Sequence, residues 1–394
     1  MDRICRACGS TDLWSFLNLG DQTLPRFPRD RDERLPHAPL ELVKCDNCHL
    51  VQLGFSVDRD LLFRRFWYRS GISSSISADL NGIAAQGVAE ANLHSGIAVD
   101  IGCNDGTLLS YLPDDVKKIG FEPAVNLTSL AEDHGTIISD YFTANRYLRL
   151  FDRANLITAV AMFYDLENPV SFCSDVASCL APDGVFLVQQ NYLGLMLDNG
   201  AYDNICHEHL MYYSLSSLKP VLEKAGLEIY RVEVNEINGG SFKTFICHRG
   251  AKPIDQSVRL MEIAEKEKGL DGRKVYRDFS YRTRTNAMRL HRFLLMNQNK
   301  RVMIYGAGTR GATIFNYAAR NGRISAAVDN NPEKKGLYYL DSRIPIISRE
   351  DALKNPPDYF LLLPYHLADE IFEREHAAFP TTKWIIPLPE FRII

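Results

Sequence analysis

Short apolar runs alternate with amphipathic segments over about residues 58–250, and this alternation restricts the fold more than any other feature of the chain. The runs are IAVDIGC, KKIGFEP, GTIISD, LITAVAMF and GVFLVQQN. Each has the length of one strand, and the segments between them are long enough for helices. This order predicts a parallel sheet flanked by helices, so we expect a central α/β domain over residues 58–250.

A second, smaller Rossmann-like α/β domain is predicted over residues 297–394, from the runs RVMIYGAG, ISAAVDN, RIPII, DYFLLLP and KWIIPL. Residues 251–296 are rich in Lys, Arg and Glu. Their apolar residues Val258, Leu260, Met261 and Ile263 recur at helical spacing, which predicts a helical connector. With an N-terminal zone over residues 1–57, the chain of 394 residues should form several separate cores.

The N-terminal zone contains two C-x-x-C pairs, Cys5 with Cys8 and Cys45 with Cys48. Four thiolates in two tight pairs match a tetrahedral zinc ion, and a closed shell of four sulfurs leaves no position for water or substrate. We therefore expect a structural zinc, with buried or redox thiols as the alternative. Nine cysteines in all, an odd number, do not suit a secreted disulfide framework.

Charge and hydropathy exclude several classes of partner. The formal net charge is -4 at pH 7, so neither nucleic acid nor an anionic membrane is an expected partner, and small molecules are. No apolar run approaches the roughly 20 residues that a bilayer span needs, and the N-terminus MDRICRACGS lacks the apolar core of a signal peptide. These observations predict a cytoplasmic protein, as a monomer or homodimer.

The first glycine-rich turn, in VDIGCNDGTLL, follows a predicted strand that ends at Asp100. Gly102 permits a ligand to approach the backbone, and Glu122 ends the next strand, where its carboxylate could accept both hydroxyls of a ribose. The turn lacks the third glycine of G-x-G-x-x-G, and an acid before the glycine suits a cationic sulfonium but repels a pyrophosphate. S-adenosylmethionine is therefore favoured over NAD, with a turn that binds nothing as the alternative.

Beyond this turn, the carboxylate of Asp140 could bind an adenine amino group beside an aromatic wall of Tyr141 and Phe142. This arrangement extends the predicted cofactor site along the carboxyl ends of the strands. The residues that we expect to bind S-adenosylmethionine are Asp100, Gly102, Asn104, Asp105, Glu122, Asp140 and Phe142.

A segment dense in titrating groups follows the predicted strand GVFLVQQN. It contains His207, Glu208, His209, Tyr212 and Tyr213. Enzymes of the α/β class place their chemistry at the carboxyl ends of parallel strands. Methylation of carbon needs a base that removes a proton next to a carbonyl, and a histidine, with an ordinary pKa of about 6.5, suits that task. Two alternatives stay open: the H-E-H group could ligate a metal, or the histidines could be structural.

Two further turns remain. INGGSF, from Ile237 to Phe242, could bring bare backbone to a substrate or merely connect a hairpin. RVMIYGAGTRG is a full G-x-G-x-x-G through Gly306, Gly308 and Gly311, which by pattern is a better dinucleotide fingerprint than the first turn. Its domain is small and shows no catalytic Tyr/Lys or Cys dyad. We therefore expect contact with a nucleotide-linked sugar or domain packing there, ahead of mononucleotide or NAD binding.

Six motifs, in this order, resemble the three-domain sugar C-methyltransferase family. They are the C-x-x-C pairs, WYRSG from Trp67, DIGCNDGTLL, CHEHLMYYSLSSL, NGGSF, and IYGAGTRG with VDNNPEKKG. The resemblance covers essentially the whole chain. It implies a zinc-binding N-terminal domain, a central class I S-adenosylmethionine domain, and a C-terminal Rossmann-like domain that helps to enclose a nucleotide-linked 4-keto sugar.

The resemblance also implies roles for single residues. His209 matches the base that removes the proton next to the ketone, and Glu208 would orient it. The family has a tyrosine where this chain has Cys206, and a histidine where it has Asp165, which leaves the identity of the acceptor open. Candidate catalytic residues are His209, Glu208, His207 and Tyr68. Candidate substrate-binding residues are Tyr68, Ser70, Tyr212, Asn238, Gly239, Ser241, Gly306 and Gly308.

We therefore predict a zinc-carrying, S-adenosylmethionine-dependent C-methyltransferase of a small nucleotide-linked keto sugar, as in deoxysugar biosynthesis. His209 would form an enolate that Tyr68 or Asn238 stabilises, and the enolate would take the sulfonium methyl. Two alternatives are an NAD-dependent nucleotide-sugar oxidoreductase that uses the second glycine-rich turn, and a non-catalytic zinc-ribbon binding protein.

Overall fold

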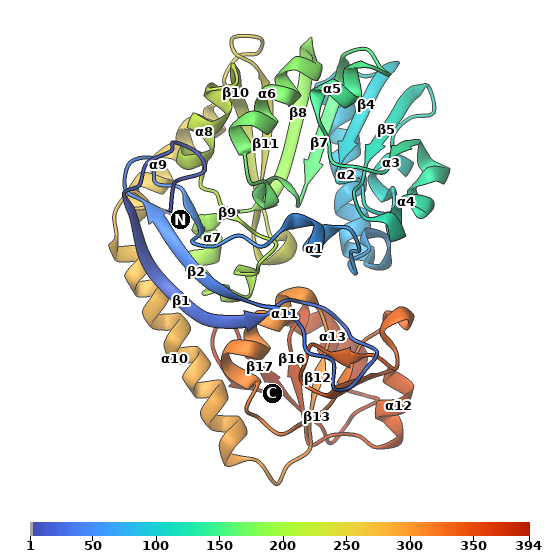
Figure 1. Cartoon of the computed structure of the whole chain (residues 1–394), viewed down its shortest axis with the longest axis vertical. Coiled ribbons are helices and arrows are strands. Elements are labelled where there is room, and N and C mark those ends of the chain that lie inside the picture. Colours follow the sequence, from blue (N-terminus) through green and yellow to red (C-terminus); the bar gives the residue numbers. More distant parts are fainter. Residues whose placement is uncertain (1–2) are drawn as a thin grey trace.

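A computed structural model describes residues 3–394, which form three sheets (Figure 1). The N-terminal sheet is antiparallel, in the order β1 (Leu13–Thr23), β2 (His37–Cys45), β3 (Val51–Leu53) and β9 (Met211–Tyr212). Its last strand comes from the H-E-H region of the chain. The long pair β1 and β2 runs from the central lobe down to the C-terminal lobe, so the N-terminal residues contact both (Figure 1).

The central sheet has seven strands, and all are parallel except β11, which runs antiparallel to both of its neighbours. In spatial order they are β10 (Leu227–Asn235), β11 (Ser241–His248), β8 (Leu180–Asn191), β7 (Ala154–Val160), β4 (Gly96–Ile101), β5 (Val116–Phe121) and β6 (Thr136–Ile138). The five apolar runs that we assigned to strands form β4 to β8, so the predicted α/β fold is confirmed.

Eight helices accompany this sheet in the described part of the chain. Serine caps start two of them: Ser73 accepts from the Ile76 amide, and Ser214 forms a capping box with Ser217. The helices are α1 (Arg59–Phe63), α2 (Ser74–Glu90), α3 (Thr107–Ser110), α4 (Val125–Ala131), α5 (Ala144–Leu148), α6 (Pro169–Cys179), α7 (Leu193–Asp198) and α8 (Leu215–Glu223).

The segment predicted to be helical contains α9 (Gln256–Lys268) and α10 (Lys274–Met296), separated at Gly269, which has the left-handed conformation of a helix cap (φ 73°). The 23 residues of α10 span about 35 Å and lead from the central lobe to the far end of the C-terminal lobe (Figure 1). The exact domain boundaries at residues 57, 250 and 296 stay a prediction.

The C-terminal sheet has five parallel inner strands with an antiparallel strand at each edge. The order is β14 (Tyr338–Tyr339), β15 (Ile344–Ile347), β13 (Ile324–Val328), β12 (Val302–Tyr305), β16 (Tyr359–Leu362), β17 (Lys383–Ile386) and β18 (Arg392–Ile393). Its helices are α11 (Thr309–Ile314), α12 (Arg349–Lys354) and α13 (Ala368–Glu375).

The two lobes meet where α11 faces the segment around Asp203 (Figure 1). Thr313 Oγ1 donates to the Ile205 carbonyl over 2.6 Å, and Arg310 Nη2 bonds Asp203 Oδ2 at the same distance. These contacts hold the start of α11 against the carboxyl ends of the central strands. None of the helices in residues 3–394 has the length and apolar character that a membrane crossing requires.

Candidate active site

The four cysteines of the C-x-x-C pairs lie together, with their sulfurs all within 4.8 Å of one another. Cys5 Sγ lies 3.5 Å from Cys48 Sγ, and Cys8 Sγ lies 3.6 Å from Cys45 Sγ. Four sulfurs bound at ~2.3 Å to one zinc would be about 3.8 Å apart, so this donor set fits the predicted zinc. His37 bonds Asp341 at the other end of the β1–β2 pair, as expected for a residue that is not a ligand.

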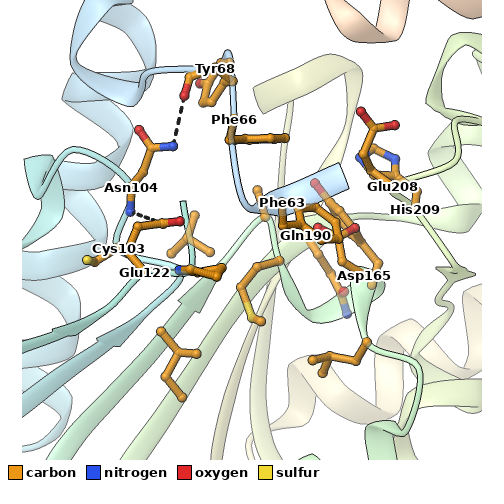
Figure 2. Close-up of a pocket in the computed structure, with 18 of the residues that line it drawn as sticks. Phe63, Phe66, Tyr68, Cys103, Asn104, Glu122, Asp165, Gln190, Glu208 and His209 are labelled. Carbon is orange, nitrogen blue, oxygen red and sulfur yellow. Dashed lines mark hydrogen bonds between the residues drawn. The ribbon is translucent and has the colours of Figure 1, made fainter. Parts of the chain in front are cut away.

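Most of the predicted site residues line one cavity of about 440 Å³, which opens at the carboxyl ends of the central strands. Its walls come from the segment around Tyr68, the central lobe, and the start of α11. Figure 2 shows Asn104 and Glu122 on one side, and Gln190, Asp165, Glu208 and His209 on the other. The cavity therefore has two ends, called here the cofactor end and the acceptor end.

At the cofactor end, the first glycine-rich turn shapes the wall. Gly102 has φ +75°, and a Cβ there would lie 3.1 Å from Met162 Cγ, so the turn needs glycine. The two carboxylate oxygens of Glu122 accept amides from Asn104 (2.9 Å) and Ala124 (2.8 Å), which fixes the carboxylate at the cavity wall. Each oxygen keeps a lone pair that a ribose hydroxyl can use.

The charge of this end suits a cationic ligand. Asp100 is buried and lines the cavity, and Thr158 donates to it over 2.7 Å. Burial raises the pKa of Asp100 to about 7, and the nearby Glu122 adds to the rise. No cation pairs with either carboxylate in the described residues. Two buried acids without a counter-ion fit the sulfonium and ammonium charges of S-adenosylmethionine.

Asp140 and Phe142 also line the cofactor end. Phe142 packs edge-on against Phe121, with ring centroids 5.0 Å apart, and provides the aromatic wall that the sequence predicted. Asp140 pairs with Arg146 and lies 3.6 Å from Arg64. The adenine contact predicted for it would therefore use a carboxylate that is already ion-paired.

Asp105, also predicted at the cofactor, lies behind the wall instead. Its oxygens accept from the Gly71 amide (2.9 Å) and from Thr107 Oγ1 (2.6 Å). Asn104 lines the cavity and also holds the WYRSG segment. Its side chain donates to the Tyr68 carbonyl (3.1 Å) and accepts from the Ser70 amide (3.0 Å). The glycine-rich turn thus holds the WYRSG segment over the cavity, which places Tyr68 and Ser70 in its wall.

At the acceptor end, His209 and Glu208 both line the cavity. His209 Nδ1 donates to the Asn204 carbonyl over 2.8 Å, and the ring packs against Tyr164 with centroids 4.2 Å apart. Burial, with the charge of Arg310, lowers the pKa of His209 to about 3. The imidazole is therefore neutral at physiological pH, with Nε2 free of a proton.

Two other residues of this segment point elsewhere. His207 is buried against the N-terminal sheet, where its Nε2 donates to the Ala38 carbonyl over 3.0 Å. Tyr212 lies in β9, away from the cavity wall, and its hydroxyl donates to the Asn204 carbonyl over 3.4 Å. The catalytic role predicted for His207 and the substrate contact predicted for Tyr212 are corrected to structural roles, because neither residue reaches the cavity.

The INGGSF turn connects β10 to β11 and also borders the cavity. Asn238, in the left-handed conformation (φ 56°), and Ser241 line the cavity, whereas Gly239 does not. Gly306 and Gly308 of the second glycine-rich turn stay outside as well, although Thr309 and Arg310 of the same motif line the cavity. A Cβ on Gly306 would lie 2.6 Å from Pro364 Cδ, and the Gly308 carbonyl accepts from Tyr339. The substrate contacts predicted for Gly239, Gly306 and Gly308 are therefore corrected to turn and packing roles.

The sequence analysis missed several polar residues of the acceptor end. Arg310 lies inside the second glycine-rich motif, between Gly308 and Gly311, where it enters the cavity wall and donates to the Asn238 carbonyl over 2.9 Å. Gln190 also lines this end. Asp165 lines it too, at one of the two positions where the chain departs from the family pattern. Cys206, at the second such position, also lines the cavity, so both departures from the family pattern mark residues of the site.

Comparison with known proteins agrees with this architecture over the whole chain. Family models match as "Putative zinc binding domain" over residues 5–63, "Methyltransferase domain" over 78–232, and "C-methyltransferase C-terminal domain" over 236–389. The C-methyltransferase NovU of Streptomyces niveus is 30% identical over 405 residues, which cover 99% of this chain and 96% of NovU.

This chain belongs to the C-methyltransferase family. Solved structures similar to this C-methyltransferase include an S-adenosylmethionine-dependent methyltransferase from Clostridium acetobutylicum (13% identity, TM-score 0.36, 44% of this chain and 92% of that one). Another is magnesium protoporphyrin IX methyltransferase ChlM of Synechocystis with bound S-adenosylmethionine (13%, TM-score 0.34, 44% and 79%).

The predicted family, enzyme class and cofactors are confirmed. The C-methyltransferase depends on S-adenosylmethionine and carries a zinc-binding domain, and its residues fit both groups. The two alternatives from the sequence, an NAD-dependent oxidoreductase and a non-catalytic binding protein, do not agree with this family.

Proposed function

We propose that this C-methyltransferase acts on a carbon next to the carbonyl of a nucleotide-linked keto sugar. The observation that carries the proposal is the position of a neutral imidazole, His209, at the opposite end of the cavity from the glycine-rich turn. A methyl acceptor bound between them would have its acidic carbon near a base, with the methyl donor on the other side.

The tautomer of His209 favours a role as base. Because Nδ1 donates its hydrogen to the Asn204 carbonyl, Nε2 carries a lone pair and is the atom that can take a proton from carbon. Because its lowered pKa makes the buried imidazole a weak base, proton removal also requires groups that stabilise the enolate. Tyr68 is suited to this, because it lines the cavity and its phenol, with an ordinary pKa of about 10, is a hydrogen-bond donor at neutral pH. Asn238 is a second candidate.

S-adenosylmethionine, when bound, supplies a methyl group that is already activated for attack by carbon. The protein then contributes orientation. Glu122 and Asp100 hold the cofactor end, His209 removes the proton at the acceptor end, and the WYRSG segment covers the space between them. Correct placement of two reactants can supply several kcal/mol of the barrier.

A second cavity, of about 700 Å³, supports a nucleotide-linked acceptor. It shares Phe66, Glu208 and Thr309 with the first cavity, so one ligand can extend from one into the other. Arg26 and Arg65 line it and make no ion pair with any residue from 3 to 394. Their charges suit a diphosphate. The second glycine-rich turn contributes Thr309 to this cavity, which is the nucleotide site that we propose.

The test is the variant His209→Ala with candidate keto-sugar nucleotides. We expect turnover to fall by at least about 10³-fold, as for loss of a general base, while S-adenosylhomocysteine binds as in the wild type. Mass spectrometry should show the 14-dalton gain of methylation and, in heavy water without cofactor, exchange of the acceptor proton, both lost in the variant. His94→Ala, an exposed histidine outside both cavities, is the control. Full activity of His209→Ala would remove the base from the mechanism.

A further inference from the structure

The acceptor end contains two carboxyl groups that have no partner for one oxygen each. Asp165 Oδ1 and Glu208 Oε2 are shielded from solvent and make no hydrogen bond, although both residues line the cavity. Figure 2 shows them on the same side of it. Buried carboxylate oxygens are strong acceptors, and leaving them unpaired is costly.

Gln190, from the end of β8, adds an independent sign of a missing ligand. Its side chain is only 2% exposed, it lines the same end of the cavity, and both its Nε2 and its Oε1 lack a partner. A buried amide normally satisfies its donor and its acceptor within the protein. The ligand of this site should therefore offer both kinds of group next to the two carboxyls.

No cation of the protein neutralises these acids. Within residues 3–394, neither Asp165 nor Glu208 takes part in an ion pair, and Arg310, which lines the same cavity, is bound to Asp203 at 2.6 Å. Burial, reinforced by Glu208, raises the pKa of Asp165, and burial also raises that of Glu208. Both shifts show that the charged forms of these carboxyls lack a counter-ion, which a cationic ligand would supply.

We propose that the methyl acceptor carries an ammonium group, bound by Asp165 and Glu208, next to an oxygen that Gln190 recognises. This inference rests on the proposed function and specifies the substrate class. An ammonium has three donors and no acceptor, which matches two acceptor-only carboxylates and the Gln190 carbonyl oxygen. The Gln190 amide nitrogen then donates to the neighbouring oxygen. A hydroxyl offers one donor and no charge, and would leave one carboxyl unpaired.

The test compares matched probes by calorimetry in the presence of S-adenosylhomocysteine. The probes are UDP- and dTDP-linked hexoses that carry an amine, an acetylated amine or a hydroxyl at carbon 2, 3 or 4. For at least one position, the amine should bind at least tenfold more tightly than its hydroxyl and acetylated counterparts. Asp165→Asn and Glu208→Gln should each reduce that preference to less than threefold.

The control variant is Asp183→Asn, which makes the same chemical change at an exposed carboxylate outside both cavities and should keep the full preference. Binding of S-adenosylhomocysteine to every variant shows that the site is folded. If hydroxyl probes bind as tightly as amines, the ammonium inference is wrong and the proposed function stands. If no sugar nucleotide binds while S-adenosylhomocysteine does, the proposed function fails, and the inference with it.

Discussion

Asp100 illustrates how burial of a single carboxyl sets the conditions for cofactor binding. The residue lies next to the last position of β4 and is 4% exposed, and its burial raises its pKa to about 7, against the lowering effect of the Thr158 hydrogen bond. A proton and a cationic ligand therefore compete for the same group near neutral pH. Below its pKa the carboxyl is mostly neutral, and above it the negative charge is present before the ligand arrives.

Affinity for S-adenosylmethionine should consequently rise from pH 5.5 to about 7 and level off above it, because release of the Asp100 proton no longer opposes binding. In Asp100→Asn the rise should disappear, and affinity at pH 8 should fall by about tenfold or more, since the attraction between opposite charges is lost. Calorimetry over this pH range measures both effects, with Asp183→Asn as the control. An identical pH profile in Asp100→Asn would contradict the assignment.

Among the elements, α11 connects the lobes through its first turn. Arg310 bonds Asp203, which is 2% exposed, and Asp203 also accepts from the Tyr365 hydroxyl over 2.8 Å. Arg310 further fixes the Asn238 carbonyl in the turn between β10 and β11. One side chain therefore positions both the lobe contact and part of the cavity wall.

Removing this cation should cost far more than removing an exposed one. Arg310→Met leaves the Asp203 carboxylate buried without a counter-ion, and we expect a loss of about 3 kcal/mol in the free energy of unfolding. The double variant Arg310→Met/Asp203→Asn should recover part of that loss. Urea titration of both variants, beside Lys274→Met for the exposed pair with Asp278, measures the difference. A loss below about 0.5 kcal/mol in Arg310→Met would disprove the role.

The strands of the structure differ in how well the sequence predicted them. The inner strands β4, β5, β7 and β8 each contain a run of buried, mostly apolar residues that can be recognised without a structure. Strand β10 has a mixed pattern of buried and partly exposed residues, and β9 has two residues, so neither was predicted. In a strand that short, pairing with β3 decides the conformation, and local sequence does not.

The residues of the site also divide into those that the sequence could predict and those that it could not. Asp100, Gly102 and Glu122 follow predicted strands and could be placed from topology alone. Arg310 reaches the cavity only because the lobes pack together, which no local pattern reveals. For the second glycine-rich turn the sequence left sugar-nucleotide contact and domain packing open. Gly306 and Gly311 are needed for close packing, because a Cβ would lie 2.6 Å from Pro364 at the first and 2.8 Å from Leu363 at the second.

At the scale of the whole molecule, the zinc cluster is linked to the acceptor end through the N-terminal sheet. The cysteines flank β2 and β3, the Leu53 amide donates to the Leu210 carbonyl over 2.9 Å, and Val51 pairs with Tyr212. Leu210 is the neighbour of His209 in the chain. The metal site therefore supports, at a distance, the strand that follows the proposed base.

Removal of zinc should therefore reduce catalysis more than cofactor binding. With a chelator, or in Cys45→Ser, we expect turnover to fall at least about tenfold while S-adenosylhomocysteine still binds to the central lobe, because structural zinc supplies folding energy to its own domain. Metal analysis gives the zinc content, and zinc but not magnesium should restore activity to the chelated protein. Unchanged turnover in a zinc-free preparation would show that the sheet holds the H-E-H segment without the metal.

The two residues of β9 also impose an order on biosynthesis. Met211 and Tyr212 complete a sheet whose other strands end at Leu53, so this sheet stays unfinished until more than 150 further residues have been translated. At 5–20 residues per second, that interval is on the order of ten seconds or more. During it, the nascent chain exposes the edge of β3, and zinc capture by the four thiols is the means of stabilising it that the chain already contains.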